Sequence, residues 1–108
     1  MKIGLGCDHA GYEIKNKVKE YLSNNFQMEI VDFGTNTIQS VDYPTYGHLV
    51  GKFVSKSANN KGIVICGSGI GISIAANKIK GVRAALCTTV DHAIMSRKHN
   101  DSNILALG

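Results

Sequence analysis

Residues 62–78, GIVICGSGIGISIAANK, join a continuous apolar run to a glycine-rich turn and a second apolar segment. The run Gly62–Cys66 is rich in β-branched residues, which is typical of a strand covered on both faces of a parallel sheet. The segment Ile70–Ile79 is apolar on nearly all sides and carries small residues, so it predicts a tightly packed, buried helix. A strand that leads through a short turn into a helix is the building unit of an α/β fold.

Short apolar runs alternate with amphipathic segments along the whole chain. We therefore predict a single domain over residues 1–108, an α/β fold built as a three-layer α/β/α sandwich with a five-stranded parallel, Rossmann-like sheet. The expected strands lie near residues 3–7, 29–33, 62–66, 82–87 and 103–107, and the expected helices near 14–22, 44–54, 70–79 and 89–98. The apolar residues of the first helix recur at helical spacing and predict its buried face: Ile14, Val18, Tyr21 and Leu22.

The chain ends at Gly108, directly after the fifth expected strand. A doubly wound sheet normally covers such a strand with a further helix. We therefore expect either that the sequence is truncated at its C-terminus or that a partner supplies this cover.

Composition narrows the possible partners. The net charge is +4, and the lysines are scattered without a basic block among aromatic residues, so no nucleic-acid partner is expected. A small anionic substrate fits this charge balance better. No apolar run approaches eighteen residues, and therefore no membrane span is expected.

Three cysteines stand at wide spacing, Cys7, Cys66 and Cys87. This pattern is neither a disulfide framework nor a zinc site, so we expect no metal and a reducing, cytoplasmic location. Cys7 and Cys87 are interpreted as small buried hydrophobic residues. Cys66 differs, because it ends a strand at the mouth of the glycine turn, where the following helix N-terminus favours a thiolate. Such a thiolate could act as a nucleophile or as a general base.

The glycine turn itself predicts an anion-binding site. Glycines at alternate positions let the backbone approach a ligand and point N–H groups at it, and the helix that begins there adds a positive dipole end. The anion could be a phosphate or a developing oxyanion. A dinucleotide fingerprint is excluded by Ile72 and Ile74, and a cysteine phosphatase would need arginine at position 72.

Ligands of an open α/β sheet bind beyond the carboxyl ends of its strands. Two further polar groups are expected at this edge, Asp8-His9 after the first strand and Asp42-Tyr43 after the second. His99-Asn100 lies instead at the end of the fourth expected helix, and must fold back toward the site in order to contribute.

Five motifs in the same order give the chain a specific resemblance over all 108 residues. It resembles the ribose-5-phosphate isomerase B family, which also includes the galactose-6-phosphate isomerase subunits. The motifs are GCDHAG (6–11), DYP (42–44), ICGSGIGISIAANK (65–78), GVRAALC (81–87) and SRKHNDSNILALG (96–108).

The resemblance implies a cofactor-independent aldose–ketose isomerisation of ribose 5-phosphate and ribulose 5-phosphate through an enediolate. By motif, Cys66 is similar to the family's base, Ser68 to a proton relay at the sugar oxygens, and His99 to the residue that opens the furanose ring. The resemblance also implies binding residues. Asp8 and Asn100 would hold the sugar hydroxyls or help ring opening, His9 would contact the phosphate, and Tyr43 would line the pocket. The enediolate charge would be held by Gly67, Ser68, Gly69, Ile70 and Gly71.

The resemblance also implies a homodimer, or a tetramer, with the site at the subunit interface. Family members carry phosphate-binding arginines in a segment beyond residue 108, and only Arg83 and Arg97 occur here. Two alternatives stay open: an isomerase of a hexose 6-phosphate, allose or galactose, and a non-catalytic module that binds a phosphosugar or a nucleotide.

Overall fold

Strands and helices alternate along the chain in the order that the sequence predicts. The computed structural model describes all residues 1–108. The elements are β1 (Lys2–Cys7), a 3-10 turn η1 (His9–Gly11), α1 (Tyr12–Asn25), β2 (Glu29–Asp32), α2 (Tyr43–Ser55), β3 (Asn60–Ile65), α3 (Ile70–Asn77), β4 (Ala84–Leu86), α4 (Val90–Asn100) and β5 (Ile104–Leu107).

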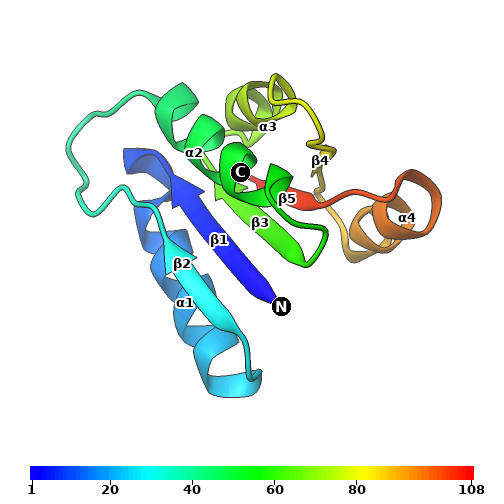
Figure 1. Ribbon diagram of the computed structural model, residues 1–108. Helices are drawn as coiled ribbons and strands as arrows, with labels where there is room; N and C mark the ends of the chain where they lie inside the picture. Colours follow the sequence, from blue (N-terminus) through cyan, green and yellow to red (C-terminus); the bar gives the residue numbers. More distant parts are fainter.

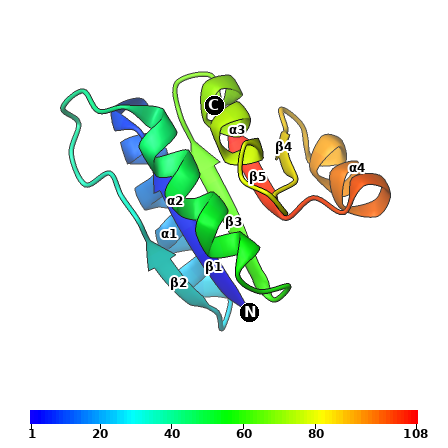
Figure 2. The same cartoon turned by 45° about the horizontal axis from the view of Figure 1, so that its top comes forward.

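All five strands are parallel, in the order β2-β1-β3-β5-β4. Helix α1 lies behind the sheet, α2 and α3 lie in front of it, and α4 lies beside the β4–β5 edge (Figure 1, Figure 2). The predicted fold class, a parallel α/β/α sandwich, is confirmed. The strand order does not follow the order of the strands in the sequence, since the last strand, β5, lies between β3 and β4. The alternation of strands and helices did not predict this order.

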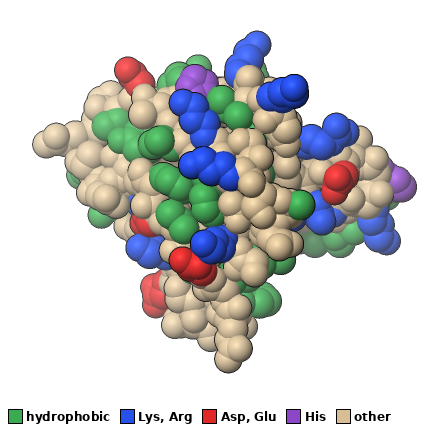
Figure 3. Space-filling view, viewed as in Figure 1, with side chains coloured by type: hydrophobic (Ala, Val, Ile, Leu, Met, Phe, Trp, Pro, Cys, Tyr) green, Lys and Arg blue, Asp and Glu red, His purple; other side chains and the backbone are tan.

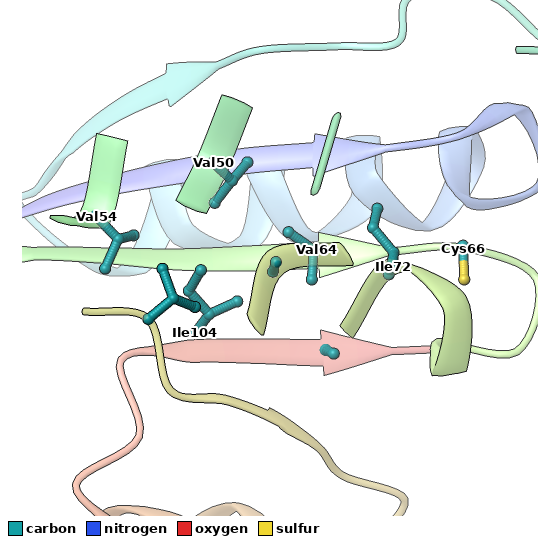
Figure 4. Packing of buried hydrophobic residues seen from close by; sticks show 9 residues of the cluster. Val50, Val54, Val64, Cys66, Ile72 and Ile104 are labelled. Carbon is teal, nitrogen blue, oxygen red and sulfur yellow. The ribbon is translucent and has the colours of Figure 1, made fainter. Parts of the chain in front are cut away.

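The main core fills the space between the sheet and the α2–α3 layer (Figure 4). Valines of α2 meet the faces of β3 and β5, and Gly62 lets α2 approach, because a Cβ there would lie 2.5 Å from Val50 Cγ1. The cluster consists of Val50, Val54, Val64, Cys66, Ile72, Ala76, Val82, Ile104 and Ala106. This core fixes the end of β3 against the start of α3, where the glycine turn lies.

Helix α3 corrects one prediction, since it is not buried on all sides. Ile72 and Ala76 face the core, but Ile70 is 53% exposed and Ile74 is 54% exposed. The sheet and α2 cover only part of the helix surface, which leaves an apolar stripe open. Figure 3 shows this side of the molecule with lysine and arginine side chains spread over it rather than gathered in one patch.

Helix α1 corrects a second prediction. Of the four expected core residues, Ile14 and Tyr21 are exposed, and Val18 and Leu22 are half-buried. The fully buried side chain of α1 is Lys15. The face that packs on the sheet is therefore rotated from the predicted one, so that Gly11, Lys15, Val18 and Leu22 follow one another along it.

Helix α4 packs loosely at the edge of the sheet. None of its residues is buried, and its exposed apolar residues are Val90, Ile94 and Met95. It begins at Thr89, whose hydroxyl accepts a hydrogen bond from the His92 N–H at 3.1 Å. Among all the helices, none combines the length and the apolar character that a membrane crossing requires.

Candidate active site

Four chain segments meet at the carboxyl edge of the sheet, the ends of β1, β3 and β5 and the start of α2. The Asp8 N–H donates to the Ile65 carbonyl at 3.2 Å, which joins the end of β1 to the end of β3. The Cys66 N–H donates to the Leu107 carbonyl at 3.2 Å, which joins β3 to the end of β5. The ring of Tyr43, at the start of α2, lies so close to Gly71 that a Cβ there would be 2.7 Å from it. The structure thus brings together most of the side chains that the sequence predicts for the site.

Cys66 is buried where β3 passes into the turn before α3 (Figure 4). Its Sγ accepts a hydrogen bond from the Gly69 N–H at 3.2 Å. A donor aimed at the sulfur and the positive end of α3 both favour negative charge at this position. Cys7 and Cys87 are also buried, as predicted. For Cys7, burial raises the pKa of the thiol, although the nearby Lys15 ammonium acts against this effect.

The glycine turn leaves backbone donors free. Gly69 has a φ of 77°, the left-handed conformation that glycine adopts without strain. The Ser68 hydroxyl accepts from the Ile70 N–H at 3.2 Å. The N–H groups of Gly67, Ser68 and Gly71 have no acceptor within the protein. Unpaired N–H groups at the start of a helix are suited to an anionic ligand.

Asp8 and His9 are held in defined positions at the same edge. A carboxylate oxygen of the buried Asp8 accepts from the Gly11 N–H at 3.1 Å and caps η1. The half-buried His9 accepts the Val41 N–H at its Nδ1, at 3.1 Å. A backbone N–H can only donate, so the hydrogen of this neutral imidazole is on Nε2. His9 therefore offers an N–H donor to a ligand.

His99 and Asn100 lie elsewhere in the chain. They form the exposed last turn of α4, which runs back from the carboxyl edge toward the amino ends of the strands. There the Asn100 carbonyl accepts a hydrogen bond from Nε of Arg83 at 2.6 Å, and Arg83 directly precedes β4. Within one chain, His99 and Cys66 are thus at opposite edges of the sheet. A contribution of this segment to the Cys66 site of the same chain would require it to fold back, and in the structure it does not.

The sequence-based reasoning missed contacts that the loop between β2 and α2 makes. Val41 binds His9, and Lys15 of α1 binds the start of the same loop. The spacing of Gly11, Lys15, Val18 and Leu22 puts Lys15 on one helical face, but the sequence does not show that this face meets the sheet. No group of three or more His, Cys, Asp or Glu side chains lies close enough together to hold a metal ion.

Nearly the whole chain is similar to proteins of one known family. The model of the family described as Ribose/Galactose Isomerase matches residues 3–108. Ribose-5-phosphate isomerase B of Escherichia coli (strain K12) is 44% identical over 107 residues, which are 99% of this chain and 71% of the relative.

Solved structures give the same result. Ribose-5-phosphate isomerase B of Clostridium thermocellum superposes with a TM-score of 0.96 at 54% identity, over 100% of this chain and 72% of that one. The enzyme of Mycoplasma genitalium, solved with bound ribulose-5-phosphate, has a TM-score of 0.93 at 38% identity, over 99% of this chain and 71% of that one.

Proposed function

The chain belongs to the ribose/galactose isomerase family, and we propose that it interconverts ribose 5-phosphate and ribulose 5-phosphate, with Cys66 as the base. The observation that carries this proposal is the Cys66 thiol on the Gly69 N–H, in a turn whose other N–H groups are free. An aldose–ketose isomerisation needs a base directly beside an oxyanion site. The names of the similar proteins support a five-carbon substrate.

The proposed chemistry is a proton transfer between C1 and C2 of the open-chain sugar. The Cys66 thiolate removes the C2 proton, the C–H electron pair forms the C1=C2 double bond, and the carbonyl electrons move to O1. The Ser68 hydroxyl gives a proton to O1 and takes one from O2. The Cys66 thiol then returns its proton to C1, which completes the ketose. Electrons move only within the sugar, so no redox cofactor takes part in these steps.

The turn is proposed to stabilise the charge that develops on O1. Free N–H groups of Gly67, Ser68 and Gly71, together with the N-terminus of α3, favour an enediolate oxygen over the neutral carbonyl. Gly69 and Ile70 complete this turn, and the Gly69 N–H holds the base. Base and oxyanion site would thus be one continuous element.

The remaining groups at the edge are proposed to bind the sugar and its phosphate. The Nε2–H of His9 is free to donate to a phosphate oxygen, because Val41 occupies Nδ1. The second oxygen of the Asp8 carboxylate is proposed to hold a sugar hydroxyl. Tyr43, packed on Gly71, is proposed to form a wall of the pocket.

We propose a homodimer in which His99 and Asn100 of a second copy complete each site. These two residues are exposed, and they lie at the sheet edge opposite Cys66 of their own chain. The stripe Ile70–Ile74 beside the site and the apolar residues of α4 are both open, which suits contact between copies. His99 would then open the furanose ring and Asn100 would hold a sugar hydroxyl.

The proposed location is the cytoplasm, because three free cysteines suit a reducing compartment.

The test is an isomerase assay in D₂O with ribose 5-phosphate, allose 6-phosphate and galactose 6-phosphate side by side. We expect turnover of ribose 5-phosphate with deuterium entering the product, and a loss of about 10²–10⁴ in kcat for Cys66→Ala. Cys87→Ala, at a second buried cysteine, is the matched control and should keep full activity. Full activity of Cys66→Ala would refute the assignment of Cys66 as the base. Preferred turnover of a hexose phosphate would refute ribose 5-phosphate as the substrate. Binding of the sugar phosphate without deuterium exchange would indicate a non-catalytic module.

A further inference from the structure

Lys15 is a buried lysine in a helix whose other lysines are exposed. Its side chain is 1% exposed, whereas that of Lys19, one turn further along α1, is 46% exposed. Burial of an ammonium group costs several kcal/mol unless polar partners replace its water. An apolar residue could fill this position without that cost, so the ammonium itself requires an explanation.

The partners of Lys15 supply full compensation, and they are concentrated at one place. Nζ lies 2.9 and 3.0 Å from the two carboxylate oxygens of Asp32, 2.8 Å from the Thr35 carbonyl and 3.3 Å from Oδ1 of Asn36. Asp32 ends β2, and Thr35 and Asn36 follow three and four residues later in the chain. Lys15 thus binds the beginning of the loop that connects β2 to α2, residues 33–42.

The charge on Asp32 is stabilised by the same contacts. Burial alone would raise the pKa of its carboxyl, but hydrogen bonds from Lys15, the Gly34 N–H and Lys19 outweigh this effect and hold the pKa below its ordinary value. Asp32 also accepts the Gly34 N–H at 2.9 Å. The ion pair therefore stays charged, and it shapes the first residues of the loop.

The loop leads from this anchor to the proposed site (Figure 1). Its first residues lie along β1, where the Thr35 N–H donates to the Cys7 carbonyl at 2.9 Å. Its last residues reach His9, which accepts the Val41 N–H, and the chain then enters α2 at Tyr43. One end of the loop consequently contacts Lys15, and the other end contacts the side chains that are proposed to bind phosphate and sugar.

We propose that Lys15 is a positioning residue for substrate binding: it fixes the loop 33–42 to α1 and so holds His9 and Tyr43 in place. Lys15 itself does not touch the substrate. This role rests on the proposed function, because it assumes that His9 and Tyr43 bind the sugar phosphate. Cys66 is held by its own turn, so the base should not depend on Lys15.

The test compares Lys15→Met with Lys19→Met, since both lysines bind Asp32 but only Lys15 binds the loop. For Lys15→Met we expect KM for ribose 5-phosphate to rise about tenfold, with a much smaller change in kcat. A tenfold rise is the size expected if the displaced His9 loses one hydrogen bond to the charged phosphate. Amide hydrogen exchange should accelerate in residues 34–42 and stay unchanged in β3. Lys19→Met should leave KM and loop exchange within about twofold of wild type, as is usual for an exposed ion pair.

A double variant, Lys15→Met with Asp32→Asn, separates positioning from stability. It removes the half-buried carboxylate charge that the single substitution leaves with only Lys19 and the Gly34 N–H as donors. The free energy of unfolding should therefore recover part of its loss, while KM stays raised and the loop still exchanges fast. Recovery of a normal KM in the double variant, or an equal rise of KM in Lys19→Met, would overturn the proposal. Absence of isomerase activity in the unsubstituted protein would refute the proposed function instead, and the exchange rates would still show whether Lys15 holds the loop.

Discussion

Replacing Gly69 by alanine should destabilise the protein strongly, and two other glycines provide the controls. The Gly69 backbone has a φ of 77°, and an added Cβ would lie 2.6 Å from Leu86 Cδ1 and 2.7 Å from the Leu107 carbonyl carbon. Gly81 has a φ of 88° but no close neighbour, since a Cβ there would lie 3.8 Å from the nearest atom, Ser55 Cβ. Gly67, in the same turn as Gly69, has neither a positive φ nor a close neighbour, since the nearest atom would be 3.6 Å away.

The magnitudes follow from these three environments. A left-handed residue with a Cβ costs about 1–2 kcal/mol, and alanine returns about 0.4–1 kcal/mol by restricting the unfolded chain. Gly81→Ala should therefore lose about 1 kcal/mol, and Gly67→Ala should be neutral or slightly stabilised. Gly69→Ala adds an overpacking cost of about 1–3 kcal/mol, because the atoms it meets include backbone that cannot move aside. Its total loss should be about 2–4 kcal/mol, a large share of the 5–15 kcal/mol typical of a domain.

The assay is urea denaturation followed by far-ultraviolet circular dichroism, which suits a chain without tryptophan. The three variants should rank Gly67→Ala, Gly81→Ala, Gly69→Ala in increasing loss of unfolding free energy. The difference between the last two measures the steric contact alone, since both share the positive φ. If Gly69→Ala were no less stable than Gly81→Ala, the turn that holds Cys66 would not pack against the end of β5 as described.

Two further predictions concern charge and assembly. The pKa of Asp32 is lower in the folded than in the unfolded protein, because the effect of burial, which raises it, is outweighed by hydrogen bonds from Lys15, the Gly34 N–H and Lys19. The ionised carboxylate therefore contributes its full stabilisation above about pH 5, and this contribution is lost as the pH falls through the folded pKa. The gap in unfolding free energy between wild type and Asp32→Asn should accordingly shrink from pH 7 to pH 3, and a gap independent of pH would contradict this assignment. The second prediction is that each site combines Cys66 of one copy with His99 of the other. Equal mixing of Cys66→Ala and His99→Asn protein should then restore about a quarter of the wild-type activity on ribose 5-phosphate. The reason is that half of the dimers would be mixed, and each mixed dimer would have one intact site out of two. No recovery after verified subunit exchange would place both residues in one chain's site.

The sequence predicts those parts of the fold and site that depend on near neighbours along the chain. Cys66 and the glycines after it are adjacent in sequence, and the end of a parallel strand fixes where they lie. Asp8, His9 and Tyr43 were correctly expected beside them, because the carboxyl ends of parallel strands share one edge. His99 was correctly expected at the end of the fourth helix. That position lies one helix length from the Cys66 edge, so its role in a site stays a prediction that depends on a second copy of the chain.

Lys15 shows why the remaining part of the site could not be predicted in the same way. In the sequence it is one of three alternate lysines, with Lys17 and Lys19, and the apolar residues between them indicate an amphipathic helix whose lysines face solvent. What distinguishes it is a carboxylate 17 residues away and a loop carbonyl 20 residues away, and both reach it only after β2 has paired with β1. Helical periodicity reports which residues share a face, but it does not state which face meets the sheet. That choice is made by long-range contacts, and here it buries the charge of Lys15 and leaves Ile14 40% exposed. A buried charge of this kind persists only where its partners are all present, so the Lys15 contacts and the loop that leads to His9 should form and break together.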